Sequence, residues 1–444
     1  MKSILLASVS FAALLGLLLV PAAILPPTPA KALLRNGGGA ASGGGGSDAL
    51  TTAKNAAVAA HGAGAWFTLG DNTKVGSVLW NCVGTCNPSG APTASAVHDI
   101  SGPNAIMMAW SGGALDTDDE WEIIWGGGHQ DYRGNEIYAI KLATLTAVRL
   151  TAPSNCLGAI GQNVCPSPDP NGFTPPESSH TYDGPVYVPG GGTGAGLYQI
   201  GTCSDIGGGC SSDSFRTASV SGLSPTDYSH WVRLTNQPTF TSAVSDLATA
   251  YDPVTNAIYA IGPSGSLQRY ALSTGVWTTL AGHRCSQFAA KGAINPGGGY
   301  MVVTGASGVD CGGQTSTGLE VYRLSDGILI QNGDADGSCS AITGASAPGF
   351  VWDPDAASGA GRFIGWNGGK TIYVLNQNTW KCTTVITAGD NPTCTNDAGS
   401  NCTGANGVQV NGTYGRFQYD HAHLVAIVVN TPDDPGFGRD MSDQ

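Results

Sequence analysis

Short apolar runs separated by polar turns repeat along the chain from about residue 66 onward, and none keeps a helical spacing of apolar positions. Such runs, rich in β-branched and aromatic residues, favour β-strands joined in hairpins. One kind of hairpin has a tyrosine strand, a polar turn and a second strand. Its copies are NEIYAIKLATLTAVRLT, SLQRYALSTGVWTTLAG, GLEVYRLSDGILIQNG, TIYVLNQNTWKCTTV and the longer SFRTASVSGLSPTDYSHWVRLT.

A second kind of hairpin precedes each of these. It has an aromatic strand, a turn with proline or asparagine, and a strand that ends in glycine. Its copies are IMMAWSGGALDTDDEWEIIWGGG, YDGPVYVPGGGTGAGLYQIG, TAYDPVTNAIYAIGPSG, AINPGGGYMVVTGASG and FVWDPDAASGAGRFIGWNGG. Each pair of hairpins makes a four-stranded unit of roughly 40 to 60 residues, which is typical of β-propeller blades. The pattern therefore predicts an all-β fold.

The repeat region begins with a single strand and ends with a single hairpin, and the two together could make one four-stranded unit. The last unit, NGTYGRFQYDHAHLVAIVVN, supplies one hairpin, whereas GAWFTLG near the start has the pattern of an isolated outer strand. Joining the N- and C-terminal strands in one blade would close the ring and remove exposed strand edges. We expect a single propeller of six four-stranded blades, with seven as the alternative if residues 74–96 or 389–410 hold another blade.

These features resemble the kelch-type, galactose-oxidase-like β-propeller superfamily. The likeness is carried by the glycine run WGGGH after a second strand and by YAIKLATLTAVRL as third and fourth strands. Such folds include oxidases, polysaccharide lyases and pure binding modules. The resemblance therefore implies a fold and leaves the function open.

The amino terminus has the pattern of a secretory signal. Lys2 precedes an apolar run, and small residues around Lys31 suit signal peptidase, so we expect a signal peptide over 1–32. An uncleaved membrane anchor is the alternative, because the apolar run is long for a signal core. The expected organisation continues with a flexible Gly/Ala/Ser-rich linker over 33–62, the propeller over 63–435 and a tail over 436–444. We expect a secreted protein, extracellular or periplasmic, with no stable membrane insertion after signal removal.

Twelve cysteines fit an oxidising compartment. Four close pairs favour local disulfides: Cys82 with Cys86, Cys156 with Cys165, Cys203 with Cys210, and Cys394 with Cys402. The other four, Cys285, Cys311, Cys339 and Cys382, can pair in three ways that the sequence does not separate. Zinc is the weaker interpretation of CVGTC, because no second ligand pair follows at a zinc-site distance.

The formal charge of −13 argues against nucleic acid and anionic membrane surfaces as partners. It leaves room for a local basic pocket, and we expect an anionic polysaccharide as partner of a monomeric protein. We expect neither a metal nor another cofactor. GDADGS resembles the start of a calcium loop, but the twelfth position is Ala345 rather than a glutamate. His421 and His423 have a spacing that could hold a metal, but a polar hairpin turn is the favoured interpretation.

Propeller topology predicts which polar residues share a face. The loop between second and third strands and the turn before a first strand lie on the same face, because strands alternate in direction. His129 lies in a loop between second and third strands. His98, His180 and Arg416 precede first strands of adjacent blades. We therefore expect one site near the central axis. Its predicted catalytic residues are His129, His180, Tyr182 and Arg416, and its predicted substrate-binding residues are His98, Tyr132 and Arg133.

This residue set favours a polysaccharide lyase that cleaves uronate-containing glycans by β-elimination. That reaction needs donors for the sugar carboxylate, a base and an acid, and His, Tyr and Arg can supply all three. A non-catalytic glycan- or protein-binding propeller is the alternative, since exposed aromatic rings could suffice for sugar binding. A copper-radical oxidase is a third hypothesis, weakened by the lack of a Tyr-His dipeptide. A purely structural role for His129 in a braced glycine-rich turn also stays open.

Overall fold

The computed structural model describes residues 48–128, 131–156, 164–190, 194–204, 210–217, 220–238, 247–262, 265–281, 289–305, 310–311, 314–315, 318–356, 359–393 and 411–442. Within these ranges the chain forms six four-stranded antiparallel sheets, with one three-stranded and one two-stranded sheet beside them. The predicted all-β class is confirmed.

Each of the first five four-stranded sheets is built from strands taken in chain order. They contain β2 (Gly113–Asp116), β3 (Trp121–Ile124), β4 (Tyr138–Lys141) and β5 (Thr146–Arg149); β7 (Pro185–Val188), β8 (Gly196–Gln199), β11 (Phe215–Thr217) and β12 (Val232–Arg233); β13 (Ala248–Asp252), β14 (Ala257–Ile261), β15 (Gln268–Ala271) and β16 (Val276–Thr279); β17 (Lys291–Asn295), β18 (Tyr300–Thr304), β21 (Leu319–Arg323) and β22 (Leu329–Asn332); and β23 (Gly349–Asp353), β24 (Arg362–Trp366), β25 (Thr371–Asn376) and β26 (Lys381–Ile386).

The sixth sheet joins the two ends of the described chain. It contains β27 (Phe417–Asp420), β28 (Val425–Val428), β29 (Phe437–Asp440) and, outermost, β1 (Trp66–Thr68). Trp66 is paired with Arg439 and Thr68 with Phe437 in this register. The predicted pairing of an N-terminal outer strand with the C-terminal unit is confirmed. The predicted tail over 436–444 is wrong in part, because Phe437–Asp440 supplies the third strand of this sheet.

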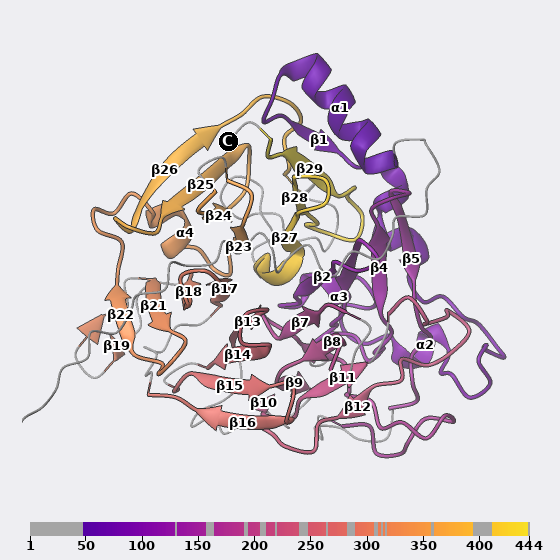
Figure 1. Ribbon diagram of the computed structural model, residues 1–444. Helices are drawn as coiled ribbons and strands as arrows, with labels where there is room; N and C mark the ends of the chain where they lie inside the picture. The colour runs from indigo at the N-terminus through magenta and orange to yellow at the C-terminus, as the bar shows by residue number, and fades with distance from the viewer. Residues whose placement is uncertain are drawn as a thin grey trace, which may run out of the picture.

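The six sheets surround a common centre, with the first strand of each sheet on the inside (Figure 1). Successive inner strands β2, β7, β13, β17, β23 and β27 contact one another, and β27 also contacts β2. Apolar side chains from facing sheets form separate core clusters, such as the one that contains Trp125, Leu197 and Trp231. The fold is therefore propeller-like, with its apolar core distributed between the sheets.

The turn between the first two strands repeats one hydrogen-bonding pattern. An Asp or Asn at the end of the first strand accepts hydrogen bonds from backbone N–H groups two or three residues later. These residues, all buried, are Asp116, Asp252, Asn295, Asp353 and Asp420. The proline and asparagine turns visible in the sequence are explained by this side-chain capping.

The small elements complete the described structure. The minor sheets contain β6 (Ser179–His180), β9 (Thr202–Ser204) and β10 (Cys210–Ser211), and β19 (Asp310–Cys311) with β20 (Gln314–Thr315); the helices are α1 (Ala49–His61), α2 (Ala94–Val97), α3 (Ala105–Met108) and α4 (Ser340–Thr343), with the 3₁₀ turns η2 (Asp71–Thr73), η3 (Val75–Val78) and η5 (Tyr414–Arg416).

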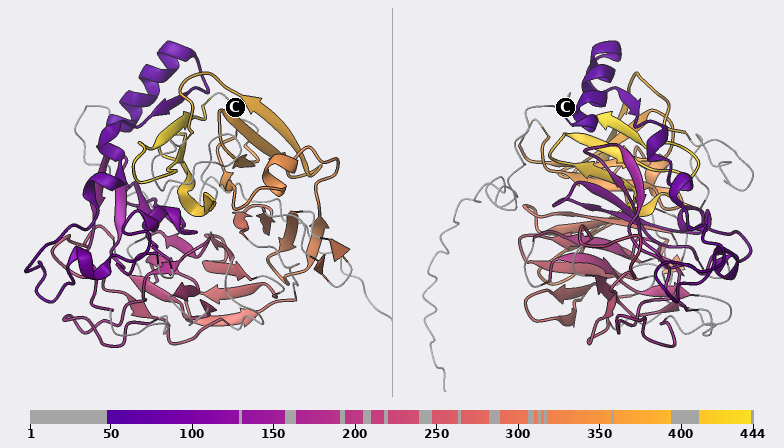
Figure 2. Two further views of the ribbon diagram at one scale, coloured as in Figure 1. Left: turned by 180° about the vertical axis from the view of Figure 1, so that it is seen from behind. Right: turned by 90° about the vertical axis from the view of Figure 1, so that its right-hand side faces the viewer.

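Helix α1 corrects the predicted linker over 33–62. Residues 49–61 are helical, and the side chain of Asp48 caps the helix by accepting a hydrogen bond from Thr51 N at 2.7 Å. Alanine has the highest helix propensity, and Leu50 provides a buried contact. The scarcity of large side chains therefore did not prevent folding. Figure 2 shows α1 at the rim of the molecule, beside the sheet that contains β1.

Three predicted disulfides are confirmed, namely Cys82–Cys86, Cys156–Cys165 and Cys203–Cys210. A fourth joins Cys339 to Cys382, whereas the predicted Cys394–Cys402 pair lies outside the described residues. Four disulfides indicate an oxidising environment. No helix in the described part of the chain combines the length and the apolar character that a membrane crossing requires.

Candidate functional site

A set of residues with left-handed backbone lies just before the innermost strands. Trp110, Tyr182, Ala289, Ala347 and Tyr414 have φ between 43° and 54°, an uncommon conformation for residues other than glycine. Hydrogen bonds connect neighbouring members, because Tyr182 N donates to the carbonyl of Trp110 at 2.8 Å and Ala347 N to that of Ala289 at 2.6 Å. These turns therefore form a connected set around the inner strands.

The aromatic members of this set contact the predicted residue His180. The ring of His180 lies 4.7 Å from the ring of Trp110 and 5.8 Å from that of Tyr182, between centroids. Tyr182 in turn meets Tyr414 edge to face at 5.9 Å. Trp110 is 37% exposed, whereas Tyr414 is fully buried. This row of rings therefore runs from the surface into the interior.

His180 lies between a carboxylate and a hydroxyl group. Its Nε2 is 3.1 Å from Oδ2 of Asp131, and its Nδ1 is 3.5 Å from Oη of Tyr182. Facing a carboxylate, Nε2 is expected to carry the proton, which leaves Nδ1 of the neutral ring as an acceptor toward the tyrosine. The three side chains can thus pass a proton from Tyr182 to His180 while Asp131 balances the charge.

Backbone and side-chain contacts hold both Asp131 and His180 in place. Ser101 Oγ donates to Oδ1 of Asp131 at 2.9 Å, and the backbone N–H groups of Ser101 and Gly102 donate to its carbonyl. On the histidine side, β6 places His180 opposite Cys203 of β9, which is bonded to Cys210. Both partners of the His–Asp pair are therefore fixed by backbone contacts and a disulfide.

The glycine run before the predicted residue His129 packs against this pair. A Cβ on Gly128 would lie 2.7 Å from both Oδ2 of Asp131 and Nε2 of His180, and Gly128 has φ +84°. A side chain at this position would therefore displace the pair and strain the backbone. His129 itself lies outside the described residues.

The three predicted substrate-binding residues lie on two neighbouring segments beside Asp131. His98 forms a backbone bridge with Tyr132 and is exposed. Arg133 is half-buried and donates through Nε to Asp99 at 2.8 Å. Tyr132 is buried, and its hydroxyl donates to Glu136 at 2.5 Å. His98 and Arg133 can therefore reach a ligand, whereas Tyr132 holds the loop.

Arg416 does not take the predicted catalytic position. Its guanidinium is fully buried and donates to the backbone carbonyls of Ser111, Gly412, Val429 and Asn430. Burial lowers its pKa to about 10, although the nearby carboxylate of Glu122 opposes this shift. These bonds join the sixth sheet to the first, so the residue that the topology placed at the site supports the fold instead.

Sequence reasoning missed two members of this group. The sequence pattern alone gives neither Trp110 nor Asp131 a role in the site. Both were detectable in principle. Trp110 lies before the first strand of its sheet, as Tyr182 does in the next sheet, and Asp131 follows the glycine run by three residues. The distance between Asp131 and His180 in sequence concealed their pairing.

A second histidine network lies at the opposite turns, between first and second strands. His421 bonds to Asp355, whereas His423 lies between Asp420 at 2.5 Å and Asp48 at 2.8 Å. The two histidines therefore contact different carboxylates. Among the residues that the structure describes, no group of three or more His, Cys, Asp or Glu is arranged to hold a metal ion.

Comparison with known proteins gives no relative from which a function could be transferred. No family of known proteins matches the chain, and no curated protein shows significant sequence similarity to it.

Proposed function

We propose that the chain is a closed six-bladed β-propeller, similar to the kelch-type, galactose-oxidase-like superfamily, and that it is a secreted polysaccharide lyase. The contact between inner strands β27 and β2 and the pairing of β1 with β29 support the closed ring. Four disulfides support passage through an oxidising compartment. The proposed substrates are uronate-containing glycans.

The observation that carries this proposal is the row formed by Tyr182, His180 and Asp131. A tyrosine whose hydroxyl faces a histidine can lose its proton to the ring, and the paired carboxylate stabilises the imidazolium that forms. The separation of 3.5 Å between Tyr182 Oη and His180 Nδ1 is long for a strong hydrogen bond. Such contacts often shorten when substrate binds.

In the proposed reaction, Tyr182 removes the proton from the carbon next to the sugar carboxylate. The electron pair of that C–H bond forms the carbon–carbon double bond as the bond to the leaving oxygen breaks. The leaving oxygen then takes a proton from the tyrosine, so that acid and base are restored. His98 and Arg133 are proposed to bind the carboxylate, whose developing negative charge needs positive or donor groups.

A non-catalytic glycan-binding propeller is the second candidate. The exposed indole of Trp110 supports it, because an aromatic ring at the surface can stack on the apolar face of a sugar. In this case Trp110 and Tyr182 would contact the glycan, while His180 and Asp131 would only hold the tyrosine.

Incubation of the purified protein with a panel of uronate polysaccharides separates the two candidates. A lyase produces unsaturated uronate ends, which are measured by their ultraviolet absorbance, and Tyr182→Phe should lose this activity while keeping substrate binding. If no polysaccharide gives product but one binds, the lyase proposal is wrong and the binding function stands.

A further inference from the structure

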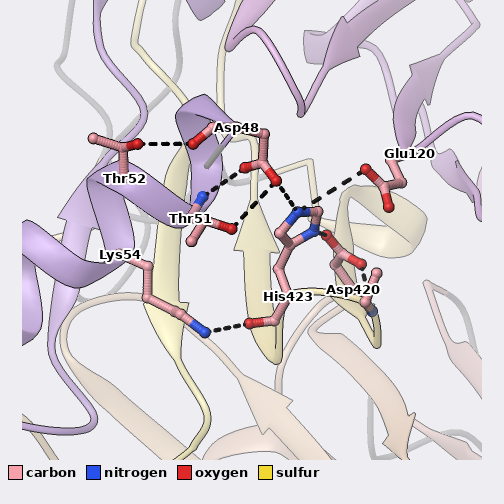
Figure 3. A network of polar contacts seen from close by, with 8 residues as sticks. Asp48, Thr51, Thr52, Lys54, Glu120, Asp420 and His423 are labelled. Carbon is pink, nitrogen blue, oxygen red and sulfur yellow. Dashed lines mark hydrogen bonds and ion pairs between the residues drawn. The ribbon is translucent and has the colours of Figure 1, made fainter. Parts of the chain in front are cut away.

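Helix α1 is joined to two other parts of the molecule through the side chain of His423 (Figure 3). Nε2 of His423 is 2.8 Å from Oδ2 of Asp48, the N-cap of α1, and 4.0 Å from Oε2 of Glu120 in the turn between β2 and β3. Its Nδ1 is 2.5 Å from Oδ2 of Asp420, at the end of β27. One imidazole thus connects α1, the first sheet and the sixth sheet.

Both ring nitrogens of His423 face carboxylates, which requires two N–H donors. Only the imidazolium form has two, because a neutral ring presents a lone pair at one nitrogen. That lone pair would repel either Asp420 or Asp48. Lys54 of α1 also donates to the backbone carbonyl of His423 at 2.5 Å. The charged and titratable groups around the ring are therefore Asp48, Glu120 and Asp420, with Lys54 beside its backbone.

The remaining contacts of α1 are few. Of its thirteen residues, only Leu50 and Ala57 are buried, so helix α1 buries little apolar surface. An isolated helix of this length is marginal in water. The polar contacts at His423 therefore add to this small apolar contact in holding α1 against the sheets.

We propose that Asp48, Glu120, Asp420 and His423 form a pH-sensitive latch that fastens α1, and through it strand β1, to the rest of the molecule. Four residues separate α1 from β1, which is the outermost strand of the sheet that joins the chain ends. The latch is closed while His423 is an imidazolium, and loss of its proton opens it.

The pH range follows from the direction of the shift. Hydrogen bonds and charges of the surrounding carboxylates raise the pKa of His423 to about 9 against the opposing effect of burial, from 6.5. The latch is therefore at full strength below about pH 6.5 and weakens as the pH rises through 9. At low pH it is retained until Asp48 is protonated, and hydrogen bonds keep the pKa of Asp48 below its ordinary value despite burial, which would raise it.

Trypsin cleavage after Lys54 in the full chain tests the latch, because cleavage requires α1 to unfold locally. Cleavage is followed by mass spectrometry from pH 6.5 to 10 and divided by the rate on a free peptide of the same sequence. The wild type should be protected at pH 6.5 and cleaved at least tenfold faster above pH 9. His423→Gln should be cleaved rapidly at every pH, whereas His421→Gln, the neighbouring histidine that bonds to Asp355, should match the wild type.

Asp48→Asn keeps the proposal testable if His423→Gln does not fold. Asparagine caps a helix as well as aspartate does, but it removes one carboxylate from the ring. The midpoint of cleavage should then move down by about one pH unit. Cleavage of the wild type that does not change with pH, or an unchanged midpoint in Asp48→Asn, would overturn the latch.

Discussion

His180 and His423 are almost equally buried, with side-chain exposures of 4% and 8%, yet their surroundings differ in one respect. His180 faces one carboxylate and one hydroxyl, whereas His423 faces a carboxylate at each nitrogen. The first arrangement leaves an acceptor nitrogen beside a half-buried tyrosine. The second keeps the ring charged.

The role of a buried histidine therefore depends on its hydrogen-bond partners and not on its burial. A ring whose acceptor nitrogen faces the hydroxyl of Tyr182 can exchange a proton with it and return it, which suits catalysis. A ring that is held as an imidazolium cannot exchange its protons without losing a contact, which suits a structural connection. Changes to each set of partners should therefore affect activity in one case and stability in the other.

The largest effect is expected from Tyr182→Phe, which removes the group proposed to exchange the proton. The rate of elimination should fall by about 10³-fold, within the range for loss of a general base. Turnover is measured by product absorbance and folding by circular dichroism. Tyr187→Phe, which removes a hydroxyl bonded to Asp118 at the turns on the other face, is the matched control and should keep its rate.

Asp131→Asn should have a smaller effect on the rate. The amide can still hydrogen-bond to His180, but it no longer favours a proton on Nε2 or stabilises the imidazolium, so we expect a loss of about 10²-fold. Loss of the carboxylate charge makes the His180 ring a weaker base, so the acidic limb of the pH profile of kcat should also shift toward lower pH. An unchanged rate and profile would show that Asp131 only braces the loop.

His423→Gln should change the pH dependence of unfolding and leave turnover intact. In the wild type, the contribution of His423 to stability should be complete below about pH 6.5 and be lost as the pH rises through 9. The raised pKa corresponds to about 3–4 kcal/mol, and solvent screening of the partly exposed ion pair with Asp48 reduces this to about 2–3 kcal/mol. The variant should lack this loss. Thermal unfolding across the pH series measures it, and parallel curves for both proteins would be inconsistent with a charged His423.

Trp110→Ala should have the smallest effect, on binding rather than on the chemical step. Loss of one stacking ring should weaken glycan affinity about five- to tenfold, which corresponds to about 1 kcal/mol. Isothermal titration calorimetry with the bound polysaccharide measures the change. Trp277→Ala, on the outer strand β16, serves as the control and should bind as the wild type does.

The fold was more predictable from the sequence than the site was. Strand pairs repeat a local pattern, and their turns depend on residues such as Asp252 and Asp353 that can be seen directly in the sequence. The pairing of β1 with β29 was also predictable, because two incomplete units complement each other. Helix α1 was missed because its segment is poor in large side chains, although its alanines and the Asp48 cap are local helix signals.

Contacts between distant segments limit the prediction of the site. Topology predicts only that His180, Tyr182 and His98 precede first strands or their loops on one face, because this follows from strand direction alone. It did not show that Arg416 is buried under backbone carbonyls or that Asp131 reaches His180. Those outcomes depend on side-chain packing between segments far apart in sequence, such as the close approach of Gly128 to both members of the pair.

One turnover assay of His180→Gln and His423→Gln beside the wild type, on the uronate polysaccharide that the wild type cleaves, distinguishes the two histidines. We predict that His180→Gln loses nearly all formation of the unsaturated product, while His423→Gln keeps the wild-type rate at pH 7. Full activity in His180→Gln would contradict the assignment of the proton-transfer row to this face of the molecule.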